Sequence, residues 1–208
     1  MDANVWDERY AGDDLVWSAE PNRFLVAQVG VLPPGRALDL ACGEGRNAVW
    51  LAECGWDVTG VDFSKVGLDK ARRLAEARGV TVQWELADVT EYTPAPGSFD
   101  LVIVMYLHLP QAARRVAFRH AAAAVATGGT LLVVGHDITN PSAGWGGPRD
   151  SAVLYGPEDV VGDLVGLEMV KAERVQRPVP TDDGVKIAID VLVRAMRAPR
   201  SETSFSGA

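Results

Sequence analysis

The apolar residues of this chain fall into short runs, and amphipathic stretches separate the runs. From Pro33 onward the pattern predicts strands over 37–40, 57–61 and 81–85, with helices over 46–54 and 65–78 between them. Two later runs, 101–105 and 130–134, are almost wholly apolar, which is typical of strands in the middle of a sheet. A helix over 111–125 separates those two strands. Strands and helices that alternate in this way form a parallel sheet with helices on both faces.

Both ends of the chain depart from this alternation. Two short amphipathic helices, 5–10 and 22–31, precede the first strand, and a Gly-, Pro-, Ser- and Asn-rich loop covers 136–155. A helix over 157–164 follows. Strands over 170–175 and 186–195, joined through Pro178, Pro180 and Asp182-Asp183-Gly184, then predict an antiparallel pair at one edge of the sheet. We expect one domain over 1–197, with 1–31 as a helical cap, and a disordered tail over 198–208.

Composition narrows the class of ligand. The chain has 208 residues, a net charge of -8 and a sequence pI near 4.9, which argues against a nucleic-acid partner and favours a small molecule. Cys42 and Cys54 have no metal-site spacing, so we expect no metal, and a reduced cytoplasmic setting fits them. The N-terminus lacks the pattern of a signal peptide, and we expect no membrane contact. A monomer and a homodimer both remain open.

The richest chemistry lies in Leu38-Asp39-Leu40-Ala41-Cys42-Gly43-Glu44-Gly45-Arg46-Asn47. This segment is a strand, a Gly-x-Gly turn and the start of a helix, and Asp62 ends the next strand. Such a turn exposes backbone amides at a helix N-terminus, and a carboxylate about 20 residues later suits a ribose diol. Any nucleotide-type site has these features, including a site for a nicotinamide dinucleotide.

Asp39 distinguishes between the possible cofactors. It lies a few residues before the turn, near the place where a dinucleotide would put its pyrophosphate, and two negative groups there would repel each other. S-adenosylmethionine carries an ammonium and a sulfonium instead. An acidic residue in this position therefore favours S-adenosylmethionine over NAD.

The segment 38–48, together with Gly60-Val61-Asp62-Phe63-Ser64, resembles the class I S-adenosylmethionine-dependent methyltransferases. The Gly-x-Gly-Arg-Asn form resembles the tellurite-resistance and thiopurine S-methyltransferase branch. The resemblance implies a Rossmann-like, doubly wound α/β fold. Its seven-stranded sheet is mostly parallel, has the order 3-2-1-4-5-7-6 and an antiparallel last strand, and an N-terminal helical lid covers it. Tyr10 and Trp17 are the lid residues we expect, although Tyr10 can equally fasten the first helix to the domain.

The same resemblance assigns the cofactor contacts. We expect Gly43 and Gly45 to admit the methionine portion, Asp39 to attract its ammonium, and Asp62 to accept the ribose hydroxyls. The remaining expected contacts are Asn47, Phe63, Ser64, Asp88, Val89 and Met105, with Phe63 on the adenine face and Asp88 and Val89 at its ring edge. Ordinary turn or helix capping is the alternative role for each aspartate.

His108 and His136 follow the fourth and fifth strands and are the candidate general bases, because histidine titrates near neutral pH. Each can also have a purely structural role. No Asn-Pro-Pro-Tyr or Asp-Pro-Pro-Tyr follows the fourth strand, which disfavours methylation of adenine. The expected function is methyl transfer to a small molecule such as a thiol, a chalcogen oxyanion or a phenol. An NAD-dependent oxidoreductase and a non-catalytic S-adenosylmethionine-binding protein are the alternatives.

Overall fold

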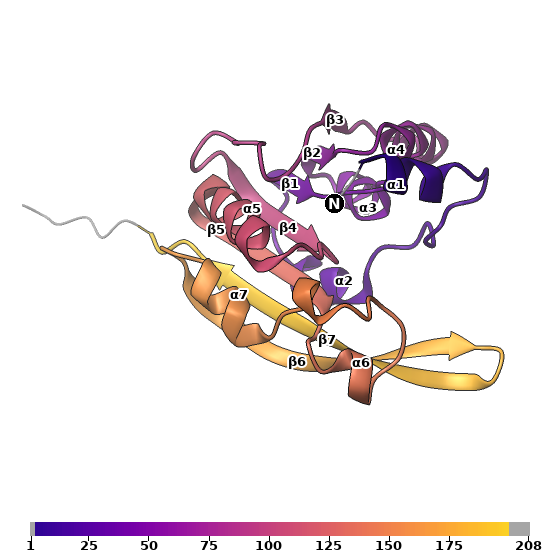
Figure 1. Ribbon diagram of the computed structural model, residues 1–208. Coiled ribbons are helices and arrows are strands. Elements are labelled where there is room, and N and C mark those ends of the chain that lie inside the picture. Colours follow the sequence, from indigo (N-terminus) through magenta and orange to yellow (C-terminus); the bar gives the residue numbers. More distant parts are fainter. Residues whose placement is uncertain (1–2, 200–208) are drawn as a thin grey trace, which may run out of the picture.

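A computed structural model describes residues 3–199, so most of the expected tail lies outside the described residues. A seven-stranded sheet with the order β3-β2-β1-β4-β5-β7-β6 forms the centre of the molecule (Figure 1). The first five strands in this order are parallel, and β7 is antiparallel to both of its neighbours, β5 and β6. The predicted order and the antiparallel last strand are therefore confirmed. The strands are β1 (Arg36–Leu40), β2 (Asp57–Asp62), β3 (Gln83–Leu86), β4 (Phe99–Met105), β5 (Val125–His136), β6 (Glu168–Thr181) and β7 (Gly184–Met196).

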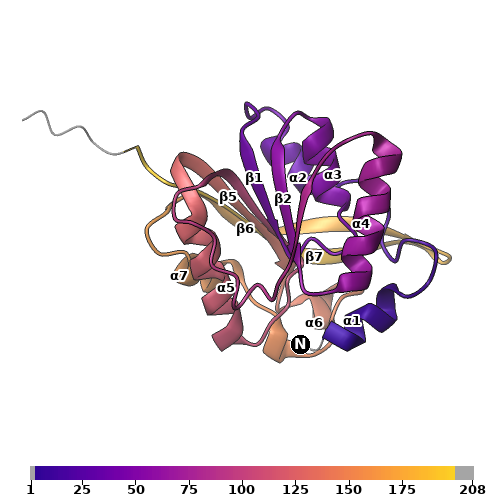
Figure 2. The ribbon, with the colours of Figure 1, turned by 90° about the horizontal axis from the view of Figure 1, so that it is seen from above.

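Helices cover both faces of the sheet (Figure 2). On one face lie α2, α3 and α4, and on the other α5 and α7, while α1 and the short α6 lie near the carboxyl ends of the parallel strands. The helices are α1 (Ala3–Tyr10), α2 (Arg23–Val29), α3 (Arg46–Glu53), α4 (Lys65–Arg78), α5 (Gln111–Ala124), α6 (Asn140–Ala143) and α7 (Pro157–Asp163). A 3-10 helix, Ser151–Val153, and α6 both lie within the segment expected to be a loop.

Two apolar clusters hold these layers together. One joins α5 and α7 to the sheet through residues such as Phe118 and Val160, and the other joins α2 and α3 through Leu25 and Leu51. Successive side chains of a strand point to opposite faces of the sheet, so alternate residues of the central strands belong to the two clusters. In β4, for example, Val102 is part of the first cluster and Ile103 of the second. A strand that is buried on both faces needs apolar residues at every position, which explains the continuous apolar runs in the sequence.

Helix α4 shows how local sequence fixes an element. Its N-cap is Ser64, whose side chain accepts a hydrogen bond from the Gly67 N–H at 3.0 Å. Its C-cap is Gly79, with φ +67, a left-handed conformation that glycine adopts without a steric penalty. Both ends of this helix lie at the predicted residues.

The β6–β7 hairpin is longer than the sequence predicted. Pro178 and Pro180 lie within β6 instead of in the connection, and only two residues separate the strands. Pro178 and Pro180 are two residues apart on the edge strand β6, so their backbone nitrogens point to the same side of the strand. That side faces away from β7, and the lack of an N–H group in proline therefore removes no hydrogen bond between the two strands. The tip of the hairpin extends beyond the rest of the sheet (Figure 1).

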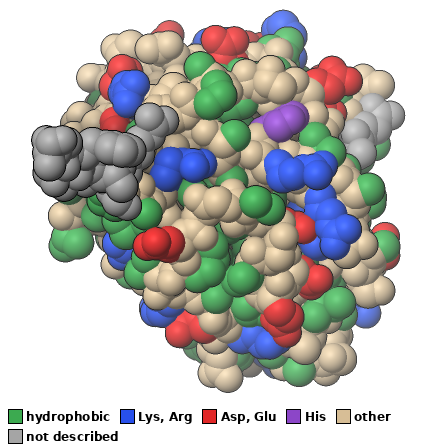
Figure 3. Space-filling view, turned by 90° about the vertical axis from the view of Figure 1, so that its left-hand side faces the viewer, with side chains coloured by type: hydrophobic (Ala, Val, Ile, Leu, Met, Phe, Trp, Pro, Cys, Tyr) green, Lys and Arg blue, Asp and Glu red, His purple; other side chains and the backbone are tan. Residues whose placement is uncertain are grey.

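The surface carries both signs of charge. Figure 3 shows one face, on which basic and acidic side chains are interspersed and hydrophobic side chains are scattered. Among residues 3–199, no helix is long and apolar enough to cross a membrane.

Candidate cofactor and acceptor site

The glycine turn after β1 is tied to the end of β2 by one carboxylate. Asp62 accepts a hydrogen bond from the Gly43 N–H at 2.8 Å and another from the Ser64 N–H at 2.9 Å. Its side chain is buried, and burial raises its pKa although these backbone hydrogen bonds oppose the shift. A carboxylate has about four acceptor sites, so these two bonds leave capacity for ribose hydroxyls.

Asp39 is the most unusual group in this region. It is fully buried, and neither of its carboxylate oxygens has a hydrogen-bond partner of good geometry among the described residues. Burial, and next the nearby Asp62, raise the pKa of Asp39 to about 7. A buried polar group without partners is costly and points to a missing cationic or hydrogen-bonding ligand. Asp39 and the glycine turn therefore fit the ammonium end of S-adenosylmethionine.

Helix α1 covers this turn. Tyr10 is buried, and a Cβ built on Gly43 would lie 2.8 Å from its hydroxyl oxygen, so the turn approaches the ring as only glycine allows. Burial, and next the charge of Asp62, raise the pKa of Tyr10. Asp7 fixes the helix in place by accepting hydrogen bonds from the Ser64 hydroxyl at 2.5 Å and the Val66 N–H at 3.1 Å. The N-terminal segment thus lies over the expected cofactor site.

The sequence interpretation missed the residue that anchors the rest of this segment. Glu44, inside the glycine turn, is buried and accepts hydrogen bonds from the Val16 N–H at 3.0 Å and the Trp17 N–H at 3.2 Å. It also forms a buried ion pair with Lys70 of α4, with 3.0 Å between Nζ and Oε1. Trp17 itself is 42% exposed and stacks under the guanidinium of Arg9. No local sequence signal distinguishes this glutamate from a solvent-exposed one.

Two predicted cofactor residues have structural contacts. A Cβ on Gly45 would lie 2.7 Å from both Ala71 and Trp84, so this glycine allows α4 and β3 to pack on the turn. Asn47 accepts a hydrogen bond from the Asn22 N–H at 2.9 Å and so holds the start of α2. Their contacts with a cofactor stay a prediction.

The other predicted residues lie around the ends of β2, β3 and β4. Phe63 is half-buried, Val89 and Met105 are buried, and Ser64 is fully buried as the α4 cap. Asp88 is exposed and accepts hydrogen bonds from the N–H and hydroxyl of Thr90, both at 2.7 Å. Among the described residues, the hydrogen bonds of its side chain are those of the turn-capping role that the sequence also allowed.

A second polar cluster is centred on Asp190, a fully buried residue of β7. One of its oxygens, Oδ2, accepts hydrogen bonds from the Tyr106 hydroxyl at 2.7 Å and from Nε of Arg177 at 2.6 Å. The other, Oδ1, lies 3.1 Å from Nδ1 of His136. Burial alone would raise the pKa of Asp190, but its contacts with His136, Arg177 and Tyr106 hold it below the usual range.

Asp190 lies against one edge of the His136 ring. The Nδ1 atom is close to Oδ1 of Asp190, although the two atoms do not have hydrogen-bond geometry, and the His136 side chain is 13% exposed. Gly147 packs against the ring, since a Cβ there would lie 2.6 Å from His136. Tyr106 has φ +57, which is rare for a bulky residue and is typical of functional sites.

His108 differs from His136. Its Nε2 accepts a hydrogen bond from the His136 N–H at 3.0 Å, and burial, followed by repulsion from His136, lowers its pKa to about 3. A neutral imidazole whose free lone pair is already bonded is a structural support for the strand that carries His136.

The loop after β5 is held by a buried amide. Asn140 donates a hydrogen bond to the Gly146 carbonyl at 2.8 Å and accepts one from the Ile189 N–H at 2.7 Å. Between these contacts the loop presents Trp145, which is 47% exposed and lies under the ammonium of Lys186.

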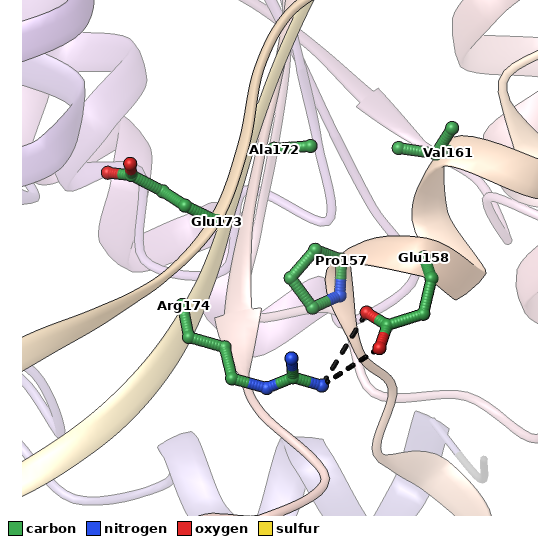
Figure 4. A pocket seen from close by; sticks show the side chains of 6 residues that line it. All are labelled: Pro157, Glu158, Val161, Ala172, Glu173 and Arg174. Atoms are coloured by element: carbon green, nitrogen blue, oxygen red, sulfur yellow. Dashed lines mark hydrogen bonds and ion pairs between the residues drawn. The ribbon is translucent and has the colours of Figure 1, made fainter.

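A surface hollow of about 450 Å³ lies elsewhere, between α7 and β6 (Figure 4). An ion pair between Arg174 and Glu158 crosses it. None of the residues that line it belongs to the predicted site, so it contributes nothing to the cofactor assignment. Among residues 3–199, no group of three side chains has the arrangement of a metal site.

Comparison with known proteins agrees with this geometry. Residues 37–129 match the model of a family described as "Methyltransferase domain". Glycine N-methyltransferase from Oryctolagus cuniculus is 35% identical over 152 residues, which cover 64% of this chain and 51% of that protein. The chain thus spans about half the length of this curated relative.

Two solved structures share the fold at low identity. One comes from work on the conversion of a disulfide bond into a thioacetal group during echinomycin biosynthesis. It is 22% identical with a TM-score of 0.77, over 96% of this chain and 93% of that one. The other is N-methyltransferase NodS from Bradyrhizobium japonicum WM9 with S-adenosyl-l-homocysteine, also 22% identical, with a TM-score of 0.70 over 94% and 97%.

The sheet order is that of the Rossmann-like methyltransferase fold, and residues 37–129, less than half of the chain, match a methyltransferase domain. These matches do not distinguish the tellurite-resistance and thiopurine branch from other methyltransferases of this class, so that finer assignment stays a prediction.

Proposed function

We propose that this protein transfers a methyl group from S-adenosylmethionine to a small-molecule acceptor. The observation that carries the proposal is Asp39, which is buried directly before the glycine turn and whose carboxylate has no hydrogen-bond partner among the described residues. Asp39 pairs with Gly60 of the neighbouring strand β2, two residues before Asp62. A dinucleotide phosphate would meet repulsion there, whereas a cofactor with an ammonium and a sulfonium would be attracted.

Different residues of the chain would bind different parts of the cofactor. Asp39 would hold the ammonium, Asp62 the ribose and Tyr10 the closed position of α1, which keeps water from the site. The bound cofactor supplies an electrophilic methyl group on its sulfonium sulfur. In-line transfer then depends mainly on how the acceptor atom is positioned.

His136 is the general base in this proposal. Asp190 orients its ring, Nε2 takes the proton from the attacking atom, and Arg177 and Tyr106 keep Asp190 ionised. His108 supports the backbone of His136 and takes no proton, because its Nε2 already accepts a hydrogen bond.

The acceptor atom is the finer part of the proposal. A thiol, a phenol or an amine needs a base and fits the histidine, and the relatives named above include N-methyltransferases. A chalcogen oxyanion needs none. Arg174, Arg177 and Lys186 lie near the final hairpin, where the tellurite-resistance branch places basic residues, but they do not match its pattern, which disfavours tellurite or thiopurine as the acceptor.

Calorimetric titration with S-adenosylhomocysteine, with NAD as the control ligand, tests the cofactor assignment. We expect micromolar affinity for the former and none for NAD. Asp62→Asn is expected to weaken binding more than tenfold, because it removes a charge-assisted hydrogen bond. Asp69→Asn, at an exposed carboxylate, is the matched control and should change nothing.

Binding of NAD alone would overturn the proposal in favour of an oxidoreductase. Binding of S-adenosylhomocysteine without turnover on any acceptor in a screen of thiols, phenols, amines and chalcogen oxyanions would instead favour a non-catalytic binding protein.

A further inference from the structure

The tip of the β6–β7 hairpin has two edges that differ in their free backbone groups. Residues 184–188 of β7 pair with β6 alone, and this part of the hairpin extends beyond the rest of the sheet (Figure 1). On the outer edge, Pro178 and Pro180 of β6 lack the N–H group that a further strand would need. Prolines on an edge strand prevent the pairing of another chain, so the outer edge is closed.

The inner edge, which belongs to β7, is open. Ile189 directs its backbone away from β6, because its N–H donates to Oδ1 of Asn140 at 2.7 Å and its C=O accepts from the Asp137 N–H at 3.0 Å. Backbone groups alternate in direction along an antiparallel strand, so Val185 and Ile187 present theirs on the same side as Ile189. No group of residues 3–199 forms a hydrogen bond with them on that side. The inner edge therefore has room in its hydrogen bonding for one more strand.

One face of the tip is apolar and exposed. Val185 and Ile187 are 66% and 38% exposed, and their partners across the hairpin, Pro180 and Pro178, are exposed on the same face. A sheet edge that binds an added strand uses both features: its backbone supplies the hydrogen bonds, and its side chains select alternate residues of the added strand.

The opposite face of the tip carries a basic residue. Lys186 lies between Val185 and Ile187, so its side chain points to the other face. Its ammonium lies 5.7 Å from the centroid of the Trp145 ring, and none of the ion pairs among residues 3–199 involves it. A carboxylate directly opposite Lys186 on an added strand would be favourable.

A second copy of this chain fits the edge poorly. In a two-fold dimer the two inner edges would run antiparallel, and Val185 of each copy would bond to Ile187 of the other. The two Lys186 side chains would then lie directly opposite each other, and like charges in that position are destabilising. Other registers would use the turn or Ile189, whose backbone groups are already bonded. The edge thus favours a foreign strand with an acidic residue.

We propose that the inner edge of β7 binds an extended peptide, with apolar residues beside Val185 and Ile187 and an acidic residue opposite Lys186. Farther along β7 the same edge pairs with β5, which ends at His136. A strand bound at the tip lies in line with β5 and directs one of its ends toward the proposed base. The inference deepens the proposed function and rests on it: the acceptor class is a short peptide that carries a thiol, hydroxyl or amine beyond the paired residues.

Nuclear magnetic resonance titration of the full chain with the peptide acetyl-Thr-Val-Glu-Val-Thr-amide tests the edge. We expect the amide signals of Val185 and Ile187 to shift and their hydrogen exchange to slow, because both N–H groups gain an acceptor. The same peptide with N-methyl groups on both valines keeps its side chains but cannot donate the hydrogen bonds, so it should bind at least tenfold more weakly. Replacing its glutamate by lysine should weaken binding at least fivefold.

Matched proline variants separate the two edges. Ile187→Pro removes an N–H from the inner edge and no bond to β6, so the peptide should bind at least tenfold more weakly. Gln176→Pro, which has the same direction as Pro178 on the outer edge, is the control and should bind the peptide like the wild type. Lys186→Glu should reverse the preference and bind the lysine peptide more tightly than the glutamate peptide.

Equal binding of the three peptides, or unchanged amides at Val185 and Ile187, would overturn the peptide site. Slower exchange of these two amides that grows with protein concentration, without any peptide, would overturn it in favour of a second copy.

Mass spectrometry after incubation with S-adenosylmethionine tests the role of the peptide as acceptor. With a cysteine added at either end, the peptide should gain one methyl group: the thiol loses its proton to His136 and its sulfur gains the methyl group, which leaves S-adenosylhomocysteine. A peptide that binds but gains no methyl group, while free thiols are methylated, would overturn that role. If the wild type fails to bind S-adenosylhomocysteine, the proposed function fails, and the titration still decides whether the edge binds a peptide.

Discussion

Asp190 illustrates how one side chain brings together residues that are far apart in the sequence. It contacts Tyr106 at the end of β4, His136 at the end of β5 and Arg177 on β6. Because the carboxylate is fully buried, each of these contacts is stronger than it would be in water. The position of the proposed base therefore depends on a residue that is itself inaccessible to the acceptor.

Replacing this base gives a kinetic prediction. His136→Gln should lower kcat for a thiol, phenol or amine acceptor about 10²-fold or more, because it removes the proton acceptor. Its affinity for S-adenosylhomocysteine should stay within twofold of the wild type. Steady-state kinetics at saturating S-adenosylmethionine measure the effect. Unchanged kcat in the variant would remove His136 from the mechanism.

Asp39 gives a prediction about stability and pH. Its pKa is about 7 when folded and near 3.8 when unfolded, so between these values the folded state binds more protons. The free energy of unfolding contributed by this group therefore falls as pH rises from about 4 to 7. The Asp39→Asn variant does not lose this stability as the pH rises. The Tm of the variant minus the Tm of the wild type should therefore be several °C more positive at pH 8 than at pH 5.

Thermal unfolding followed by circular dichroism at both pH values checks this. The buried amide of the variant costs the same stability at both pH values, so this cost cancels when the two differences in Tm are compared. An equal difference in Tm at pH 5 and pH 8 would contradict the raised pKa of Asp39.

The sequence predicted that some polar residues lie together at the carboxyl ends of the strands and missed others, for one physical reason. Asp39 and Asp62 were predictable because the ends of consecutive parallel strands meet at one edge of a sheet. Glu44, Asp190 and Arg177 were not, because their roles arise from contacts with residues 13 to 84 positions away that no local pattern encodes. His108 and His136 were equivalent in sequence, and only the hydrogen bond between them separates their roles.

At the scale of elements, the N-terminal segment is held to the domain by its own polar contacts. Glu44 bonds to the backbone at residues 16 and 17, and Lys70 bonds to the Asp14 carbonyl at 2.5 Å. These contacts fix a stretch that has no helix or strand of its own. This stretch can move only if Glu44 and Lys70, which form a buried ion pair, lose their hydrogen bonds to its backbone.

Glu44→Ala should therefore destabilise the protein by about 3 to 5 kcal/mol, because it leaves the ammonium of Lys70 buried without its counter-ion. Cleavage by a nonspecific protease should also become faster between residues 11 and 21. Glu53→Ala, which breaks an exposed ion pair with Arg78, is the control and should cost under about 1 kcal/mol. Urea unfolding and limited proteolysis measure both effects. Equal costs in the two variants would contradict the anchoring role of Glu44.

The elements themselves were largely predictable. Helix α4 begins and ends at the predicted residues because a serine cap and a left-handed glycine mark its ends locally. The extent of the β6–β7 hairpin was not, because proline normally argues against a strand, and only the edge position of β6 makes Pro178 and Pro180 acceptable. The short helix α6 was hidden inside a loop-like composition.

At the scale of the whole molecule, β7 connects the edge strand to the rest of the sheet. Val193 pairs with Val133 on one side and with Ala172 on the other, so its strand is hydrogen-bonded on both edges. Residues 184–188 of the same strand pair with β6 alone. The two halves of β7 thus contribute very differently to stability.

Proline substitution should expose this difference. Val193→Pro removes a ladder bond and strains the centre of the sheet, so we expect a loss of about 3 kcal/mol or more and a Tm at least 6 °C lower. Val185→Pro, near the hairpin turn and 66% exposed, should change the Tm by less than 3 °C. Circular dichroism melting curves compare them, and similar losses in the two variants would show that the hairpin tip is as important as its base.

The place of β7 also has a consequence for synthesis on the ribosome. Until residues 184–196 have emerged from the exit tunnel, the growing sheet ends at β5 and β6 has no strand to pair with. Asp190 arrives within that last strand, so a nascent chain can complete its glycine turn long before His136 gains its carboxylate partner. The residues proposed to bind the methyl donor are encoded early and the carboxylate beside the proposed base is encoded late, so a prematurely terminated chain would contain the first without the second.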